Sequence, residues 1–212
     1  PGRVPPCATV SRCENEGKIT ARTGLKSLCI GGVAGNTGYA TVKFCTNKGA
    51  VVADIGKDVN GGAKGLAQVG GIVGQTKADI SRCENFGTVT SKGACSANIG
   101  GIVGMPHEAL VIADCLNYGV VKATGDLPSQ TGGIAGNIGR PVHVHGCMNY
   151  GEVIFDGVST SGRSTSGGIV GNVYVTKNST AGAYVRSCIN YGKVYAASGG
   201  NNYGVTNRKA IH

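Results

Sequence analysis

Cysteine is the residue type whose number and spacing first suggest chemistry in this chain. The sequence holds nine cysteines in 212 residues, and six of them begin the motif Cys-x-Asn-x-Gly. Their thiols could pair as disulfides, ligate zinc or stay reduced. No Cys-x-x-Cys pair occurs anywhere in the sequence, which disfavours a zinc site. The motif cysteines are Cys13, Cys45, Cys83, Cys115, Cys147 and Cys188.

An aromatic row follows the same motif. The residue between the asparagine and the glycine is aromatic in the last four copies, whereas Glu16 and Lys48 stand there in the first two. If the asparagine points inward, the next residue points outward, and successive copies then form an exposed strip on which sugars or bases could stack. The alternative is that the rings only stabilise one another, by roughly 0.5–1.5 kcal/mol per pair. The candidate ligand-binding residues are Phe86, Tyr118, Tyr150 and Tyr191.

The remaining chemically suggestive residues do not form a convincing site. His143 and His145 share one face of a predicted strand, but Val144 occupies the apolar position, so both imidazoles are predicted to face solvent. Asp54 and Asp58 are the only close pair of aspartates, and the other acids are dispersed. We therefore predict no catalytic residue, no metal and no cofactor. Surface ion pairs are the interpretation of Arg12 with Glu14 and of Arg82 with Glu84.

The elements that position these residues are set by an internal repeat. The motif cysteines are 32, 38, 32, 32 and 41 positions apart. A second motif, Gly-Gly-(Ile/Val)-(Val/Ala)-Gly, occurs between them at 31–35, 70–74, 100–104, 132–136 and 167–171, and a degenerate copy begins at Gly199-Gly200. The motif asparagines are Asn15, Asn47, Asn85, Asn117, Asn149 and Asn190.

This period predicts an all-β fold, a right-handed parallel β-helix (β-solenoid) of about six coils, formed by residues 1–212 as a single repeat domain. Three short strands per coil are expected, one of them the Gly-Gly-Ile-Val-Gly segment. Stacked coils place equivalent residues about 4.8 Å apart. Each asparagine should turn inward and bond backbone groups of neighbouring coils, and the glycine two positions later should supply a positive-φ turn.

The same stacking predicts the redox state of the motif thiols. Cysteines stacked directly above one another have poor geometry for disulfides, so the six motif thiols are predicted to be reduced and to act as small apolar residues. Cys7, Cys29 and Cys95 lie outside the repeat, and their redox state is left open.

Composition excludes several classes of protein. The chain has 38 glycines and no tryptophan, so a helical bundle is excluded. No apolar run approaches the roughly 20 residues of a membrane-spanning helix, and we predict no membrane span in this chain. The net charge is +9, but the basic residues are scattered, which is typical of a solvated surface. No nucleic-acid partner is predicted.

The two motifs together resemble the GLUG-type repeats of bacterial cell-surface, adhesin-like proteins, which also occur beside immunoglobulin A peptidases. The resemblance extends over residues 7–205. It implies a right-handed β-helix located outside the cell or on the bacterial surface, as part of a longer protein. It implies no chemical activity, because such repeats mostly serve as stalks and scaffolds.

Three functions remain open from the sequence. The first is a non-enzymatic extracellular scaffold or adhesin segment for cell adhesion, which self-associates end to end. The second is a glycan-binding module that uses the aromatic row. The third is a polysaccharide-degrading enzyme on a β-helix scaffold. Candidate partners are host glycans, host surface proteins and further copies of the chain.

Overall fold

The computed structural model describes residues 8–23, 27–56, 65–93, 95–108, 110–125, 127–139, 141–157, 164–174 and 182–197. Cys7, Asp58 and the degenerate motif at Gly199-Gly200 lie outside these ranges, as does the side chain of Cys95. The described residues form 28 short strands in five parallel sheets, A to E, and no helix.

The first three sheets contain one strand from each of six coils. Sheet A holds β1 (Ala8–Ser11), β6 (Ala40–Lys43), β11 (Ile80–Ser81), β16 (Leu110–Ala113), β21 (Val142–His145) and β26 (Tyr184–Arg186). Sheet B holds β2 (Glu14–Asn15), β7 (Thr46–Asn47), β12 (Glu84–Asn85), β17 (Leu116–Asn117), β22 (Met148–Asn149) and β27 (Ile189–Asn190). Sheet C holds β3 (Ile19–Thr23), β8 (Val51–Ile55), β13 (Val89–Gly93), β18 (Val121–Gly125), β23 (Val153–Phe155) and β28 (Val194–Ala196).

The other two sheets contain five strands each. Sheet D holds β4 (Ser27–Gly31), β9 (Gly65–Gly70), β14 (Cys95–Gly100), β19 (Ser129–Gly132) and β24 (Thr165–Gly167). Sheet E holds β5 (Ala34–Asn36), β10 (Val73–Thr76), β15 (Val103–Pro106), β20 (Ala135–Ile138) and β25 (Val170–Val173).

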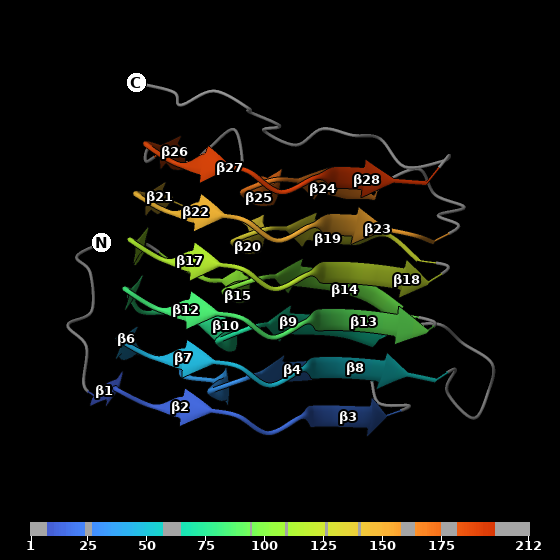
Figure 1. Ribbon diagram of the computed structural model, residues 1–212, viewed down its shortest axis with the longest axis horizontal. Helices are drawn as coiled ribbons and strands as arrows, with labels where there is room; N and C mark the ends of the chain where they lie inside the picture. Colours follow the sequence, from blue (N-terminus) through green and yellow to red (C-terminus); the bar gives the residue numbers. More distant parts are fainter. Residues whose placement is uncertain are drawn as a thin grey trace.

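The fold is the predicted all-β, right-handed parallel β-helix. In Figure 1 the near strands β2 and β3 run from left to right while the coils climb from the N-terminal blue to the C-terminal red. Equivalent positions pair in register throughout, for example Asn85 with Asn47 and Asn117. The prediction of three strands per coil was wrong, because each complete coil contains five.

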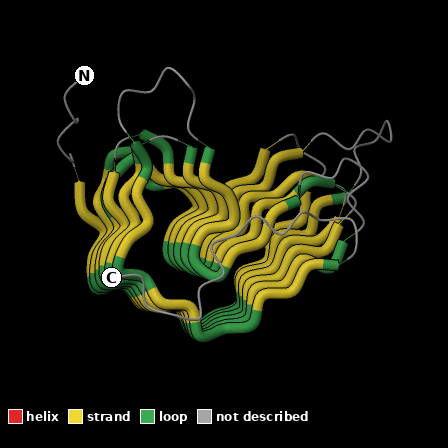
Figure 2. Tube along the Cα trace, turned by 90° about the horizontal axis from the view of Figure 1, so that it is seen from above, coloured by secondary structure: helices red, strands yellow, loops and turns green. Residues whose placement is uncertain are grey.

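The Gly-Gly-Ile-Val-Gly motif is the corner between sheets D and E rather than a strand. Viewed along the helix axis in Figure 2, this corner lies near the middle of the cross-section, turned inward toward sheet B. Its second glycine lies against the asparagine of sheet B: a Cβ on Gly71 would come within 2.4 Å of Cγ of Asn85. Any side chain at that glycine would push the corner away, so glycine is required by close approach.

The inward corner divides the interior into two apolar cores. One core lies between sheets A and E and includes the buried thiols with residues such as Ile72, Ile80 and Ile112. The other lies between sheets C and D and includes Val69 and Phe155. Neither core is continuous with the other, because the asparagines and glycines meet between them.

The asparagines of sheet B form a hydrogen-bonded column through all six coils. In each of the first five coils, Nδ2 donates to Oδ1 of the asparagine in the next coil, at 2.7 to 2.8 Å. Nδ2 of every asparagine also donates to the carbonyl of the glycine two residues later, at 2.8 Å. The inward direction was predicted, but the partner in the neighbouring coil is a side chain rather than backbone.

The glycine two residues after each motif asparagine does not have the predicted positive φ. It is required by close approach instead, because a Cβ on Gly119 would lie 2.0 Å from the carbonyl oxygen of Gly87. The positive φ falls on the residue before each cysteine, where the chain turns from sheet A into sheet B. These residues are Arg12, Phe44, Arg82, Asp114, Gly146 and Ser187, with φ between 50° and 63°.

The asparagine column predicts a position-dependent loss of stability. Asn117→Ala should lower the free energy of unfolding by about 2–4 kcal/mol, because it leaves the buried Oδ1 of Asn149 and the carbonyl of Gly119 without donors. Asn15→Ala in the half-buried first coil should cost about 1 kcal/mol or less, since water can replace the lost bonds. Urea unfolding of both variants measures the difference, and equal losses would contradict the column's role.

Candidate binding surface on sheet B

The four aromatic residues of the predicted site form one stacked column on the outer surface beside sheet B. Each follows an inward asparagine and therefore points outward, with 46% of Phe86, 41% of Tyr118, 42% of Tyr150 and 62% of Tyr191 exposed. Ring centroids of successive residues are 4.8, 4.9 and 5.0 Å apart, and the planes differ by only 4°, 6° and 12°. The pleat and the coil spacing together impose this geometry.

Stacking determines what the column can offer a ligand. The inner ring faces are covered by their neighbours, so edges and hydroxyl groups face the solvent. Only the outer face of a terminal ring, such as that of Tyr191, is not covered by another ring of the column. A sugar that stacks on a ring face has little room here, whereas a flat partner that contacts ring edges has a continuous surface.

A second outward column extends the apolar surface, and the sequence analysis missed it. The residue after each motif cysteine is Leu116, Met148 or Ile189 in the last three coils, and each is half-buried. The Tyr150 hydroxyl donates to Sδ of Met148 at 3.4 Å, which joins the two columns. Comparing this one position across the six copies would have revealed the change. We call the seven residues the apolar strip: Phe86, Leu116, Tyr118, Met148, Tyr150, Ile189 and Tyr191.

The first two coils of the same surface are charged. Nζ of Lys48 lies 2.5 Å from Oε1 of Glu14 and 3.2 Å from Oε1 of Glu16. These hydrogen bonds lower the pKa of the Glu14 carboxyl and raise the pKa of the Lys48 ammonium. Sheet B therefore presents a polar N-terminal half and an apolar C-terminal half.

The predicted pairs of Arg12 with Glu14 and of Arg82 with Glu84 are not among the ion pairs of the described residues. Glu14 pairs with Lys48 of the next coil rather than with Arg12, and the Arg82 guanidinium lies 5.4 Å from the centroid of the Phe44 ring. Phe44 is the equivalent of Arg82 in the preceding coil, whereas Lys48 is the equivalent of Glu16 and reaches Glu14 diagonally. In both cases the partner comes from an adjacent coil and not from the residue two positions away.

The motif cysteines line the core between sheets A and E as free thiols. Cys45, Cys83, Cys115, Cys147 and Cys188 are buried, and Cys13 in the first coil is exposed. Each thiol lies within hydrogen-bonding distance of the carbonyl two residues earlier, for example Sγ of Cys115 at 3.2 Å from the oxygen of Ala113. Burial raises the pKa of Cys45 to about 11 and also raises the pKa of Cys115.

The two histidines lie on the outer side of β21, as predicted. Val142 and Val144 are buried, while His143 and His145 are half-buried, and the ring of His143 meets that of Tyr184 edge-on at 4.9 Å. Within the described ranges, no three His, Cys, Asp or Glu side chains are grouped so that they could hold a metal ion.

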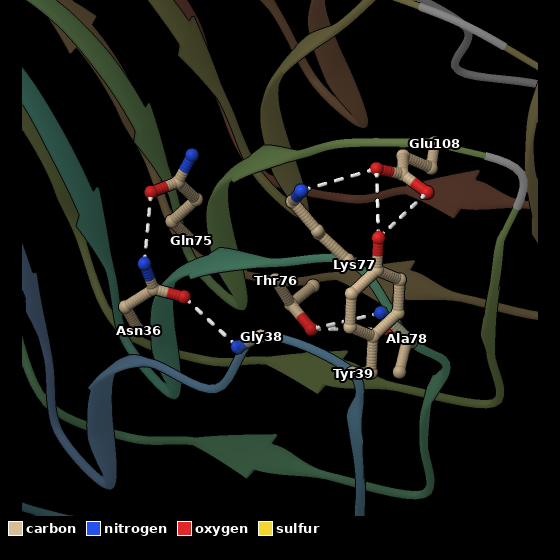
Figure 3. A network of polar contacts seen from close by, with 8 residues as sticks. All are labelled: Asn36, Gly38, Tyr39, Gln75, Thr76, Lys77, Ala78 and Glu108. Atoms are coloured by element: carbon tan, nitrogen blue, oxygen red, sulfur yellow. Dashed lines mark hydrogen bonds and ion pairs between the residues drawn. The ribbon is translucent and has the colours of Figure 1, made fainter. Parts of the chain in front are cut away.

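A polar cluster at the corner between sheets E and A was not predicted (Figure 3). The Tyr39 hydroxyl donates to Oε1 of Glu108 at 3.3 Å, and Nζ of Lys77 lies 3.1 Å from the same oxygen. Nζ of Lys77 also lies 5.2 Å from the centroid of the Tyr39 ring. The hydrogen bond that Lys77 donates to Glu108 raises the pKa of the Lys77 ammonium, which favours its charged form. The cluster joins three successive coils.

No family model, curated protein or solved structure matches this chain. No helix among the described residues is long and apolar enough to cross a membrane. A proposal about function therefore rests on the surface chemistry of the chain itself.

The buried thiols predict a graded reactivity. At pH 8, iodoacetamide should modify Cys13 rapidly and Cys45 and Cys115 very slowly, because the reactive thiolate is both inaccessible and disfavoured in the core. Peptide mass spectrometry measures each site, with the urea-unfolded chain as the control in which all sites react. Uniform rates in the folded chain would contradict the thiol column.

The same thiols predict a pH dependence of stability. The folded pKa of Cys45, about 11, lies above its ordinary value of 9.0, so the unfolded chain loses that proton first. The resulting stabilisation is complete below pH 9 and is lost as the pH rises toward 11. In Cys45→Ala, which has no thiol to ionise, the decline in unfolding free energy between pH 9 and 11 should be shallower. An unchanged slope would contradict the assignment.

Proposed function

We propose that this chain is a non-enzymatic extracellular scaffold or adhesin segment of a bacterial surface protein, and that it associates end to end. The observation that carries the proposal is the unbroken asparagine column, from Asn15 to Asn190. The repeated asparagines join each coil to the next by hydrogen bonds. A repeat built in this way produces a rod whose length grows with the number of coils. The resemblance to GLUG-type surface repeats supports the extracellular location.

The carboxylates favour this role over polysaccharide cleavage. Glycosidases need two cooperating carboxyl groups that are free to exchange protons. Here Asp54 contacts Arg22 and Lys92, and Glu108 contacts Lys77. These contacts are those of surface ion pairs that stabilise adjacent coils.

The apolar strip supports an adhesive role more than sugar stacking. Its ring faces are covered by one another, whereas its edges form a flat surface with Leu116, Met148 and Ile189. Exposed contiguous apolar surface is typical of protein–protein contacts. A host surface protein fits this strip better than a glycan does.

The direction of the asparagine column supports end-to-end association. Within the described residues, Asn15 Oδ1 accepts no hydrogen bond, and Asn190 Nδ2 donates only to the carbonyl of Gly192. Strands β1, β2 and β3 each pair on one side only in the described structure. The acceptor at one end and the donor at the other are complementary in a head-to-tail stack of two copies.

Sedimentation velocity over a wide range of concentration tests this association. The purified chain should form species that lengthen with concentration, seen as rods by electron microscopy. Val10→Lys should abolish them, because the half-buried Val10 of β1 faces the core and a charge there would be buried by a second copy. Ser11→Lys is the matched control, since Ser11 is exposed on the same strand.

A chain that stays monomeric at all concentrations, or rods that persist in Val10→Lys, would contradict the end-to-end arrangement. Release of reducing sugar from a polysaccharide panel, with loss of turnover in an Asp or Glu variant, would replace the scaffold proposal with an enzymatic one. Adhesion of bacteria that display the chain to immobilised host proteins tests the apolar strip. It should fall in Tyr118→Ala and be unaffected by Thr9→Ala, which changes an exposed residue of sheet A.

A further inference from the structure

The outward faces of sheets D and E meet in a polar seam that no repeat motif contributes to. The two sheets diverge from the inward corner (Figure 2), and the strand registers place one side chain per coil on each side of the seam. Sheet D contributes Cys29, Gln68, Asn98, Gln130 and Thr165. Sheet E contributes Asn36, Gln75, Met105, Asn137 and Asn172.

Contacts across the seam show that the two rows face each other. Sγ of Cys29 in sheet D lies 3.3 Å from Oε1 of Gln75 in sheet E and 2.8 Å from Oε1 of Gln68 in sheet D, and its single proton can be donated to either oxygen. Sδ of Met105 in sheet E lies 3.6 Å from Nε2 of Gln68 and 3.2 Å from Nδ2 of Asn98, both in sheet D. Figure 3 shows Gln75 bonded to Asn36 of the coil below.

The amides of the seam have unused hydrogen-bonding capacity, in contrast to the asparagine column of sheet B. Asn98 is only 2% exposed, yet its Oδ1 has no partner, and its Nδ2 reaches only a thioether, which is a weak acceptor. Gln68 is 6% exposed, and its Nε2 likewise donates only to Met105. The side chain of Gln130, in β19, has no hydrogen bond to another described residue, and Oγ1 of Thr165 is buried without one. Buried polar atoms left in this state are costly, so each is a place where a ligand gains affinity.

The chemistry of the seam selects an uncharged, hydroxyl-rich ligand. Cys29 is its only ionisable side chain, and burial raises the pKa of that thiol, which keeps it neutral. A primary amide offers donors and acceptors together, and a hydroxyl group does the same, so the two can pair in either orientation. A charged ligand would gain no counter-charge from these side chains.

The spacing of the seam favours a saccharide over an extended peptide. Amides of successive coils repeat about every 4.8 Å along the axis, whereas groups on one face of an extended peptide repeat about every 6.6 Å. A peptide laid along the seam would lose register within two coils. A chain of sugar rings carries hydroxyl groups at several positions on each ring and can meet a closely spaced row of amides.

We propose that this seam is a binding site for an uncharged saccharide, with Gln68, Asn98 and Gln130 bonding its hydroxyl groups. The Met105 side chain, which is unbranched and flexible, covers two of these amides and moves aside when the ligand enters. The site lies on different sheets from the apolar strip and does not depend on the scaffold role.

Isothermal titration with defined probes tests the proposal. The probes are gluco-, xylo- and manno-oligosaccharides, an oligogalacturonate and an uncharged Ser-Gly peptide. At least one uncharged saccharide should bind saturably with an affinity independent of salt. Gln130→Leu should weaken it about tenfold and Asn98→Leu by a similar factor, since each removes a hydrogen bond to the ligand. Met105→Ala should strengthen binding.

The variants are chosen so that folding and binding separate. The Gln130 side chain makes no hydrogen bond to the described residues and Asn98 leaves its Oδ1 unpaired, so both leucine variants should melt at or above the temperature of the parent chain. Tyr118→Ala, on the apolar strip, is the matched control and should bind as the parent does.

Three results would overturn the proposal. The first is that neither the parent chain nor Met105→Ala binds any uncharged saccharide. The second is binding that is lost in Tyr118→Ala and kept in Gln130→Leu, which would assign the saccharide to the aromatic column. The third is tighter binding of the peptide than of every saccharide. A failed seam leaves the end-to-end association untouched, because that is measured without a ligand.

Discussion

The contact between the asparagine of sheet B and the glycine corner of sheets D and E is the constraint on which the structure depends. The asparagine points inward because side chains alternate along the strand and the next residue points outward. A buried amide must be fully hydrogen-bonded. It is satisfied by the asparagine of the adjacent coil and by the carbonyl two residues later, as at Asn117 with Asn149 and Gly119. Its remaining surface rests on a glycine that has no side chain, such as Gly101. The interior is thereby divided into two small cores.

This arrangement separates the residues that make the rod from those that face the surroundings. The inward cysteine and asparagine of the motif recur in every coil, because each must fit its equivalents above and below. Outward positions carry no such restraint, and sheet B uses that freedom. Its surface changes from Glu14, Glu16 and Lys48 to the apolar strip within two coils. The seam between sheets D and E varies more, from Cys29 through Gln68 to Thr165, on a backbone that does not change. Function is therefore expected in the outward columns.

Much of the fold could be predicted from the sequence. Because one repeat corresponds to one coil, residues at equivalent positions of the repeat must stack on one another. The burial of Asn85 and the outward direction of Phe86 follow from that alone. The corner at Gly70–Gly74 was mistaken for a strand, since its Ile-Val pair is typical of strands and nothing local shows that Asn85 will lie against Gly71. The positive φ at Phe44 and Arg82 was missed because neither residue type favours it. The seam could not be predicted either, since it depends on how sheets D and E diverge after the corner.

The most direct test of the central contact is a double-mutant cycle at Gly168 and Asn190. A Cβ on Gly168 would lie 2.3 Å from Cγ of Asn190, and its three nearest atoms all belong to that side chain. Unfolding free energies are measured for the parent chain, Gly168→Ala, Asn190→Ala and the double variant. The contact predicts that Gly168→Ala is destabilising alone and costs at least about 1 kcal/mol less when Asn190 is alanine. Losses that add to within about 0.5 kcal/mol would show that the asparagine column and the glycine corner do not depend on each other.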